Sequence, residues 1–214
     1  MAIAAMRRGI LGGTFDPVHT GHLILAQEVL WRLGLDGIWF IPTGLPWMKR
    51  GEALTSAEHR FAMVKLAIAG NDRFHASALE VERPGETYTV DTLEELRAGE
   101  MADGELLFIM GADTLQTLHR WKRPERILEM ARIVVALRPG HGDVDLRALE
   151  AIDPTAVERV MLVQMPLIEI SGTELRRRAG HGEPIRYLVP DAVEHYIQEH
   201  GLYRGREPVR SGKA

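Results

Sequence analysis

The segment GGTFDPVHTGHL, Gly12 to Leu23, joins two hydrophobic stretches that have different patterns. The apolar run before it, Arg8–Gly12, is typical of a buried strand. The stretch after it, His22–Leu33, has the apolar spacing of a helix and stops at Gly34. A strand that passes through two glycines into a helix indicates an α/β unit with a ligand near the junction.

The joining segment itself carries groups that suit a polyanion. Gly12 and Gly13 let the backbone turn sharply and come close to a ligand. Asp16-Pro17 predicts the start of the helix, because Asp can cap it and Pro suits its first turn. A helix N-terminus attracts phosphate, and His19 and His22, three residues apart, share one face of the first turn. The combination predicts a phosphate-binding site.

Three other interpretations of this segment stay open at this stage. A Gly-Gly pair after a strand is often only a turn. A His pair at this spacing can bind a metal ion, but the chain has no Cys and no third ligand at a suggestive spacing, so we assign no metal ligand. An NAD-dependent oxidoreductase is disfavoured, because GGTFDP lacks the G-x-G-x-x-G pattern of dinucleotide-binding proteins.

The composition of the chain is that of an ordinary globular protein. Its 214 residues are 45% hydrophobic and 26% charged, which is enough for one good core. A formal net charge of -4 gives no sign of a broad nucleic-acid surface. No apolar run reaches the roughly 18 residues needed to cross a bilayer. We therefore expect a cytoplasmic protein that binds neither nucleic acid nor membrane, and a homo-oligomer stays open.

Strand-like and helical segments alternate along the rest of the chain. The further strands that we expect are Gly37–Ile41, Phe74–Val81, Glu105–Met110, Arg132–Leu137 and Arg159–Met165. The further helices that we expect are Ser56–Ala69, Thr89–Ala98, two segments around Trp121 with the second beginning at Pro124, Thr173–Ala179 and Asp191–His200. This alternation predicts an α/β, Rossmann-like fold: a doubly wound parallel sheet with helices on both faces.

The same pattern predicts one domain over residues 1–203. It includes a small C-terminal helical subdomain from about residue 171, and a flexible tail follows at 204–214. Ligands bind at the carboxyl ends of the strands in such sheets. The segments that this rule places on one rim are Gly12–His22, Ile41–Lys49, Met110–Asp113 and Arg138–Gly140.

A second candidate for anion binding is ISGTELRRR, Ile170 to Arg178. Ser171 and Glu174 have the spacing of a capping box, which predicts a helix start. Arg176 then falls near the first turn, where a cation opposes the helix dipole and a bound anion would relieve the conflict. A solvated basic face is the alternative.

Both segments resemble motifs of one enzyme family. GGTFDPVHTGHL resembles the signature of nucleotidyltransferases with a (T/H)xGH motif, in the form found in bacterial nicotinate-nucleotide adenylyltransferases. ISGTELRRR is similar to their closing Ile-Ser-Ser-Thr-x-x-Arg motif, with Gly172 in place of the second Ser. The resemblance covers most of the chain. It implies transfer of AMP from ATP to nicotinate mononucleotide, giving deamido-NAD and pyrophosphate in NAD biosynthesis, with Mg²⁺ bridging the ATP oxygens.

The resemblance also implies roles for residues at matching positions. The groups that would neutralise the phosphates are His19, His22, Lys49 and Arg176. The remaining residues of the ATP site would be Gly12, Gly13, Thr14, Phe15, Asp113, Arg138, Ser171 and Thr173. At the acceptor site, Thr87 and the backbone around Tyr88 would meet the nicotinate carboxylate, and Trp121 would stack on the pyridine ring. Each has a plainer alternative, such as a helix N-cap for Asp113 and simple packing for Trp121.

One segment departs from the family pattern. Most members have Pro-Pro-His-Lys where this chain has Pro46-Trp47-Met48-Lys49, so the contact of that His is not expected here. Rival functions are adenylyl transfer to phosphopantetheine or to nicotinamide mononucleotide, and a nucleotide-binding regulatory module without turnover. The segments TYTVDTL and HRW disfavour phosphopantetheine.

Overall fold

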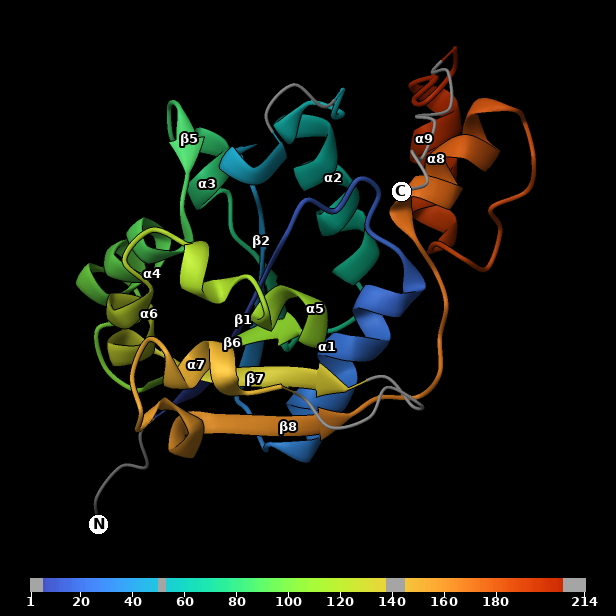
Figure 1. Ribbon diagram of the computed structural model, residues 1–214. Coiled ribbons are helices and arrows are strands. Elements are labelled where there is room, and N and C mark those ends of the chain that lie inside the picture. The colour runs from blue at the N-terminus through green and yellow to red at the C-terminus, as the bar shows by residue number, and fades with distance from the viewer. Residues whose placement is uncertain (1–5, 50–52, 138–144, 206–214) are drawn as a thin grey trace, which may run out of the picture.

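The computed structural model describes residues 6–49, 53–137 and 145–205. The centre of this described part is a six-stranded sheet in which all neighbouring strands are parallel (Figure 1). In order across the sheet, the strands are β4 (Phe74–Ala76), β2 (Gly37–Pro42), β1 (Arg7–Gly13), β6 (Glu105–Gly111), β7 (Arg132–Leu137) and β8 (Val160–Gln164). The chain winds outward in opposite directions from β1 and β6, so their carboxyl ends border the crevice where such sheets bind ligands.

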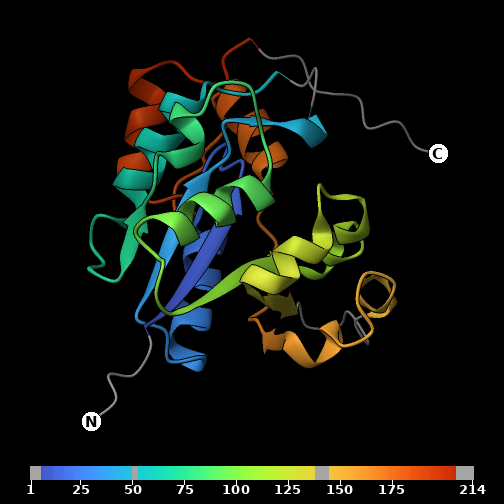
Figure 2. The same cartoon turned by 90° about the vertical axis from the view of Figure 1, so that its left-hand side faces the viewer.

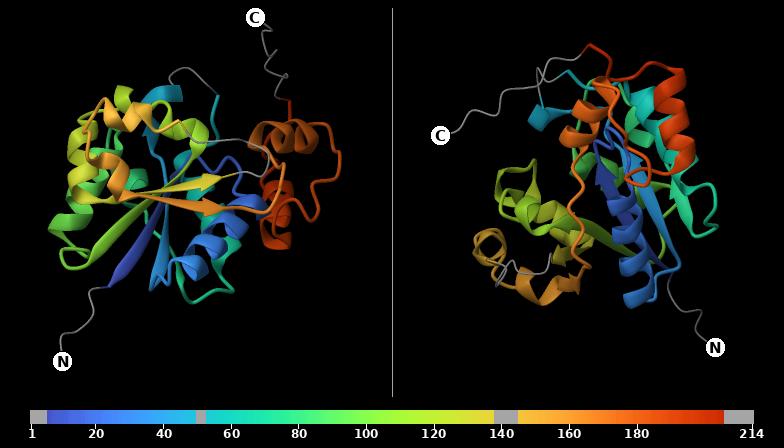
Figure 3. Two further views of the ribbon diagram at one scale, coloured as in Figure 1. Left: turned by 60° about the horizontal axis from the view of Figure 1, so that its bottom comes forward. Right: turned by 90° about the vertical axis from the view of Figure 1, so that its right-hand side faces the viewer.

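Helices cover both faces of this sheet (Figures 2 and 3). The longer helices are α1 (Thr20–Arg32), α2 (Ala57–Ile68), α4 (Thr89–Ala98), α6 (Pro124–Met130), α8 (Gly172–Gly180) and α9 (Asp191–Glu199). The short helices are α3 (Leu79–Glu82), α5 (Ala112–Leu115) and α7 (Arg147–Glu150), and 3-10 turns span Trp47–Lys49, Leu118–Arg120 and Ala156–Arg159. A separate parallel pair joins β3 (Leu45–Pro46) to β5 (Glu86–Thr87). The predicted α/β, Rossmann-like fold is confirmed.

Successive side chains of each strand enter two different cores. On β1, Ile10 packs with residues of α4 and α6, whereas Leu11 packs with residues of α1 and α2. On β6, Phe108 and Ile109 divide in the same way. Because side chains alternate across a strand and both faces are covered, these strands are apolar throughout rather than at every second position.

The last two helices pack on the α1–α2 side of the sheet. α9 is in contact with α2 (Figure 3), and Leu175 of α8 and Ile197 of α9 enter the same core as Leu11. The C-terminal subdomain from about residue 171 stays a prediction, and residues 206–214 of the predicted flexible tail lie outside the described residues. No helix in the described part of the chain is both long enough and apolar enough to span a membrane.

The predicted strand Phe74–Val81 is wrong in its second half. β4 ends at Ala76, and the chain turns into α3 at Leu79. β4 is an edge strand with β2 as its partner, and the pairing ends at Phe40. The alternation of apolar and polar residues beyond that point therefore reflects a turn and a short helix, which no second strand holds in an extended form.

The predicted helix start at Asp16-Pro17 is also wrong. α1 begins at Thr20 with His19 as its N-cap, and the Asp16-Pro17 peptide bond is cis. Asp16 is buried, and its carboxylate accepts hydrogen bonds from Thr55 N at 3.1 Å and from Tyr203 Oη at 2.8 Å. Hydrogen-bond partners so distant in the sequence leave no local pattern. From the sequence alone, Asp16 therefore has the features of a helix N-cap.

Candidate active site

Two adjoining pockets open at the carboxyl ends of β1 and β6. The histidine pocket is a cavity of about 440 Å³ whose lining includes His19, His22 and Asp113. The tryptophan pocket is a cavity of about 260 Å³ whose lining includes Trp47 and Thr87. The residues that line both pockets are Gly12, Phe108, Thr114 and Trp121. A ligand in one pocket would therefore lie directly beside a ligand in the other.

A backbone hydrogen bond fixes the ring of His22. The N–H of His19 donates to His22 Nδ1 at 3.2 Å. A neutral imidazole that accepts at Nδ1 carries its proton on Nε2, so His22 presents an N–H donor. Burial and the neighbouring His19 hold the pKa of His22 well below its usual value, which keeps the ring neutral near pH 7 in the free protein.

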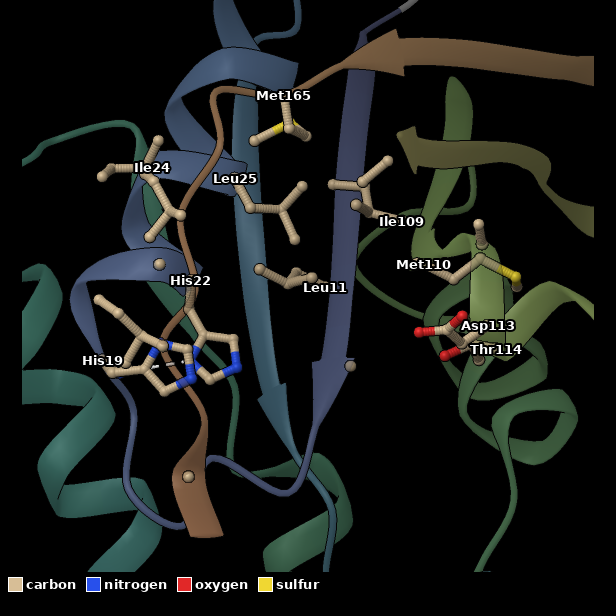
Figure 4. A pocket seen from close by; sticks show the side chains of 18 of the residues that line it. Leu11, His19, His22, Ile24, Leu25, Ile109, Met110, Asp113, Thr114 and Met165 are labelled. Atoms are coloured by element: carbon tan, nitrogen blue, oxygen red, sulfur yellow. Dashed lines mark hydrogen bonds between the residues drawn. The ribbon is translucent and has the colours of Figure 1, made fainter. Parts of the chain in front are cut away.

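The two imidazole rings stack at the N-terminus of α1, with their centroids 3.7 Å apart (Figure 4). Phe15 packs edge-on against His22, with ring centroids 5.0 Å apart. A Cβ added to Gly13 would lie 3.1 Å from the Phe15 ring. Phe15 is buried and lines neither pocket, so it supports the His22 ring rather than forming a wall.

The first three residues of the segment that joins β1 to α1 (the glycine segment, Gly12–His19) lie at the boundary between the pockets. Gly12 lines both pockets, whereas Gly13 and Thr14 line the tryptophan pocket. A Cβ at Gly12 would lie 3.7 Å from the Phe108 ring, which is ordinary van der Waals contact, so core packing does not require a glycine there; its lack of a side chain leaves bare backbone in the lining of both pockets. This backbone can thus come near a ligand that spans the two pockets.

The N-terminus of α8 reaches the histidine pocket. Ser171 is the N-cap, and its Oγ accepts a hydrogen bond from Glu174 N at 3.2 Å, which confirms the predicted helix start. Ser171 and Gly172 line the pocket. A Cβ on Gly172 would lie 3.1 Å from the Asp16 carbonyl oxygen and 3.3 Å from Arg176 Nη1. A second serine here would therefore crowd both groups.

Arg176 connects α8 to the glycine segment. Its Nη1 donates to the carbonyl oxygen of Asp16 at 2.8 Å, and its Nη2 donates to Thr173 Oγ1 at 3.3 Å. Neither Arg176 nor Thr173 belongs to the lining of either pocket. The guanidinium therefore holds the loop before α1 in place while it brings positive charge to the first turns of α8.

Asp113 stands opposite the two imidazoles across the histidine pocket (Figure 4). It lies in the first turn of α5, whose N-cap is Gly111, so the N-cap alternative for Asp113 is wrong. Within residues 6–49, 53–137 and 145–205, no group of three or more His, Cys, Asp or Glu residues is placed to hold a metal ion.

The tryptophan pocket has a fixed aromatic wall and two buried threonine hydroxyls. Trp121 Nε1 donates to Thr117 Oγ1 at 3.3 Å, and its ring meets Phe108 edge-on with centroids 6.0 Å apart. The Oγ1 atoms of Thr43 and Thr87 are buried; that of Thr87 interacts with the Glu80 carboxyl group, and that of Thr43 has no hydrogen-bond partner in the described part of the chain. Buried hydroxyls are normally paired, so the one at Thr43 favours a polar ligand in this lining.

A buried carboxyl group stands behind these hydroxyls. Glu80 Oε1 accepts a hydrogen bond from Thr92 Oγ1 at 2.7 Å, and both residues line the tryptophan pocket. Burial raises the pKa of Glu80, and the hydroxyls of Thr92 and Thr87 oppose that rise. Arg83 Nη1 donates to the same Thr92 oxygen at 3.0 Å. The Thr92 hydroxyl therefore donates its proton to Glu80 and accepts from Arg83, so both of these partners belong to the protein.

The side chain of Tyr88 lies outside the lining of both pockets. Its ring stacks on Trp47 with centroids 6.1 Å apart, and Lys122 Nζ lies 4.6 Å from the ring centroid. Its hydroxyl donates to Glu86 Oε2 at 2.6 Å. Tyr88 therefore supports the wall formed by Trp47, and its predicted contact with the nicotinate carboxylate stays a prediction.

Two predicted site residues lie outside what the structure describes. Lys49 ends the 3-10 turn that begins at Trp47, but its side chain is outside the described residues. Arg138 is outside them entirely. Residues of the other predicted rim segments, Gly12–His22, Ile41–Lys49 and Met110–Asp113, do line the two pockets.

Comparisons with known proteins show which family this chain resembles. A family model described as cytidylyltransferase-like matches residues 10–178. A probable nicotinate-nucleotide adenylyltransferase from Thermomicrobium roseum is 50% identical over 203 residues, which cover 95% of this chain and 94% of that protein. A protein of the same description from a Roseiflexus species is 48% identical over 196 residues, 92% of this chain and 97% of that protein.

The chain belongs to the nicotinate-nucleotide adenylyltransferase family. A solved structure of Plasmodium falciparum nicotinic acid mononucleotide adenylyltransferase, complexed with NaAD, has a TM-score of 0.74 to this chain. It is 20% identical, and the match covers 92% of this chain and 97% of that one. At that identity the likeness supports the fold of this adenylyltransferase family member.

Sequence reasoning assigned no role to Thr43 or Glu80 in this family member. Thr43 directly follows β2, a strand that the sequence predicts correctly. Its position at the carboxyl end of that strand could have identified it as a ligand-site residue. Glu80 lies where the sequence predicts a strand, and the short helix α3 that buries its side chain has no clear pattern.

The hydrogen bond between Tyr203 and Asp16 gives a stability prediction. Tyr203→Phe is expected to lower the free energy of unfolding by about 2 kcal/mol, because a buried carboxylate loses one donor. Urea unfolding followed by circular dichroism measures the change. Tyr196→Phe is the control, since its hydroxyl bonds His59 Nδ1 at 2.8 Å nearer the surface and should contribute less than about 1 kcal/mol. An equal loss of unfolding free energy in the two variants would contradict the view that the buried Asp16 carboxylate depends on the Tyr203 donor.

Proposed function

We propose that the chain transfers AMP from ATP to nicotinate mononucleotide, with the histidine pocket holding ATP and the tryptophan pocket holding the acceptor. The adjoining pockets carry this proposal. One contains two stacked imidazoles at a helix N-terminus, the other contains a fixed Trp121 and buried threonine hydroxyls, and Gly12 lies in both linings. Membership of the family, at up to 50% identity among the relatives described above, supports the same reaction.

The reaction needs two anions held in line more than it needs a proton acceptor. A phosphate oxygen of nicotinate mononucleotide forms a bond to the α-phosphorus of ATP. The bond from that phosphorus to the oxygen bridging the β-phosphate breaks, and pyrophosphate leaves with its electron pair. A phosphomonoester has a second pKa of about 6, so the nucleophile is already ionised near neutral pH. Alignment and charge neutralisation then provide the rate.

The chain supplies donors and positive charge to the phosphates of ATP. His22 presents Nε2–H from the first turn of α1, and His19 stacks against it. The N-terminus of α8 adds the backbone N–H groups of its first turn next to Ser171 and Gly172, and the Arg176 guanidinium lies on the same helix. By the family resemblance, Lys49 would add a further positive charge for a phosphate. These groups favour the extra charge that develops as pyrophosphate leaves.

Mg²⁺ fits this site through the substrate rather than through a protein cage. Transfer of a nucleotidyl group from ATP generally needs a divalent metal ion, and the described residues offer no cluster of three or more ligands for one. Mg²⁺ prefers oxygen ligands and keeps several waters. We therefore assign it to phosphate oxygens and water, with the Asp113 carboxylate in the same lining. When bound, the ion neutralises charge on the phosphates.

The acceptor site explains a preference for nicotinate. Trp121 would provide a flat face for the pyridine ring, and the Thr87 hydroxyl would provide a donor for its carboxylate. A buried donor that pairs with a carboxylate oxygen is left unpaired by many analogues, which gives strong discrimination.

A release assay for pyrophosphate tests the proposal. With ATP and Mg²⁺, the purified chain is expected to release pyrophosphate rapidly when nicotinate mononucleotide is added, and only at background level with phosphopantetheine. Release with phosphopantetheine alone would move the function to that acceptor. No release with either, together with tight ATP binding, would indicate a regulatory nucleotide-binding module.

A further inference from the structure

Arg60 of α2 is a fully buried cation with no role in the site described so far. Its side chain is 1% exposed. The guanidinium donates three hydrogen bonds, all to backbone carbonyl oxygens: Nε to Thr55 at 2.9 Å, Nη1 to Thr14 at 2.8 Å, and Nη2 to Gly44 at 2.9 Å. Burial lowers the pKa of Arg60, and Asp16 opposes that effect.

The carbonyls that Arg60 holds belong to the segments that build the two pockets. Thr14 follows β1 and lines the tryptophan pocket, two residues before the Asp16 carbonyl that Arg176 holds. Gly44 follows β2 and leads directly to Pro46 and Trp47 in the same lining. One side chain therefore spans the loops after two adjacent parallel strands, at the edge where the substrates must meet.

The loop at Gly44 has little freedom to settle elsewhere. A Cβ added to Gly44 would overlap the carbonyl oxygen of Glu80 and come within 3.0 Å of Thr87 Cγ2. The loop is thus packed against α3 and β5 on one side and held by Arg60 at its carbonyl oxygen. Without Arg60, the Gly44 carbonyl oxygen would lose its hydrogen-bond donor. The loop would then be held in position by packing on one side only.

Only an arginine can make this set of bonds. Its planar fork carries five N–H donors with fixed directions and keeps its charge when buried. A lysine has the charge, but its compact ammonium group cannot reach three carbonyls in three directions. A change from Arg to Lys therefore keeps the buried charge and removes the geometry.

We propose that Arg60 is a positioning residue for the transfer reaction, because it fixes the loop after β1 and the loop after β2 relative to each other. This inference rests on the proposed function, in which those loops hold ATP and the acceptor in line. It acts through the backbone of Thr14 and Gly44, without touching either substrate. A small misplacement of aligned reactants lowers the rate strongly, whereas binding of each substrate alone depends less on it.

The test compares Arg60→Lys with a matched variant, Arg97→Lys. Arg97 also donates to two backbone carbonyls, those of Gly104 at 2.8 Å and Met130 at 2.6 Å, but it lies outside both pockets. We expect both variants to lower the midpoint of thermal unfolding. Arg60→Lys should also lower kcat by about tenfold, with a smaller change in KM for either substrate. Arg97→Lys should keep the wild-type kcat.

The outcomes separate this inference from the proposed function. A wild-type chain that releases no pyrophosphate with nicotinate mononucleotide overturns the proposed function. An active wild type, with Arg60→Lys folded and its kcat and both KM values within about twofold of wild type, overturns the positioning role. If Arg60→Lys does not fold, Arg60→Gln replaces it, because a neutral amide costs less to bury and still cannot reach all three carbonyls. A lowered kcat in that variant supports the role, and wild-type kinetics overturn it.

Discussion

His22→Asn is expected to lower kcat by about 10²–10³-fold, because it removes one preorganised donor to the transferring phosphates. The asparagine side chain can still accept the N–H of His19, which His22 Nδ1 accepts at 3.2 Å. The start of α1 therefore stays capped, and the donor at Nε2 is lost. Steady-state release of pyrophosphate measures kcat, and thermal unfolding checks the fold.

A second histidine provides the control for this variant. His75 stacks against Trp39, with ring centroids 4.3 Å apart, and lies outside both pockets. His75→Asn should leave kcat within about twofold of wild type. A His22→Asn enzyme whose turnover matches that control would show that the stacked imidazoles do not act on the phosphates.

Thr87→Val should lower the ratio of kcat/KM for nicotinate mononucleotide to kcat/KM for nicotinamide mononucleotide by about 100-fold. The side chain keeps its shape but loses the buried hydroxyl, and a hydrogen bond to a charged group contributes roughly 1.5–3 kcal/mol. The loss should fall on kcat/KM for nicotinate mononucleotide. The wild-type preference itself should be on the order of 10³ or more, as for sites that pair one specific polar group.

The amide substrate is the internal control for this second variant. Its kcat/KM should change little in Thr87→Val, because the hydroxyl is matched to a carboxylate. Equal rates for the two acceptors in the wild type would contradict the role of Thr87 and Tyr88. An equal loss for both acceptors in the variant would indicate a general packing defect.

Local sequence patterns predicted most of the framework. Thr89–Ala98 was predicted as a helix and has those bounds, Pro124 begins α6, and Ser56 caps α2. These features depend on apolar period and on cap residues, which act within one or two turns. The parallel sheet followed from the same alternation, and so did the rim at which the pockets open.

Contacts between distant segments were beyond the reach of those patterns. Asp16 looked like a helix cap, but Tyr203 and Thr55 hold its carboxylate in the core. Arg60 lies in the predicted helix Ser56–Ala69 with no motif around it, and its three carbonyl acceptors come from loops that only folding brings together. The strand predicted over Phe74–Val81 is too long. Its length depends on how far β2 extends beside it, and a local sequence pattern does not contain that information.

The candidate site was predictable where one motif carries the chemistry. His19, His22 and Ser171 gather at one pocket, as the motifs suggest, and their roles in binding ATP stay predictions. Thr43 and Glu80 carry no motif, and they enter the lining of the tryptophan pocket through the course of loops after β2 and β4.

Transfer of label from ATP tests the central claim most directly. With ATP labelled at the α-phosphate, nicotinate mononucleotide and Mg²⁺, the label should appear in deamido-NAD, in an amount equal to the pyrophosphate released. With ATP labelled at the γ-phosphate, the label should appear in pyrophosphate alone. Label from the γ-phosphate on the acceptor, or α-label that stays with ATP while the chain binds both substrates, would contradict adenylyl transfer.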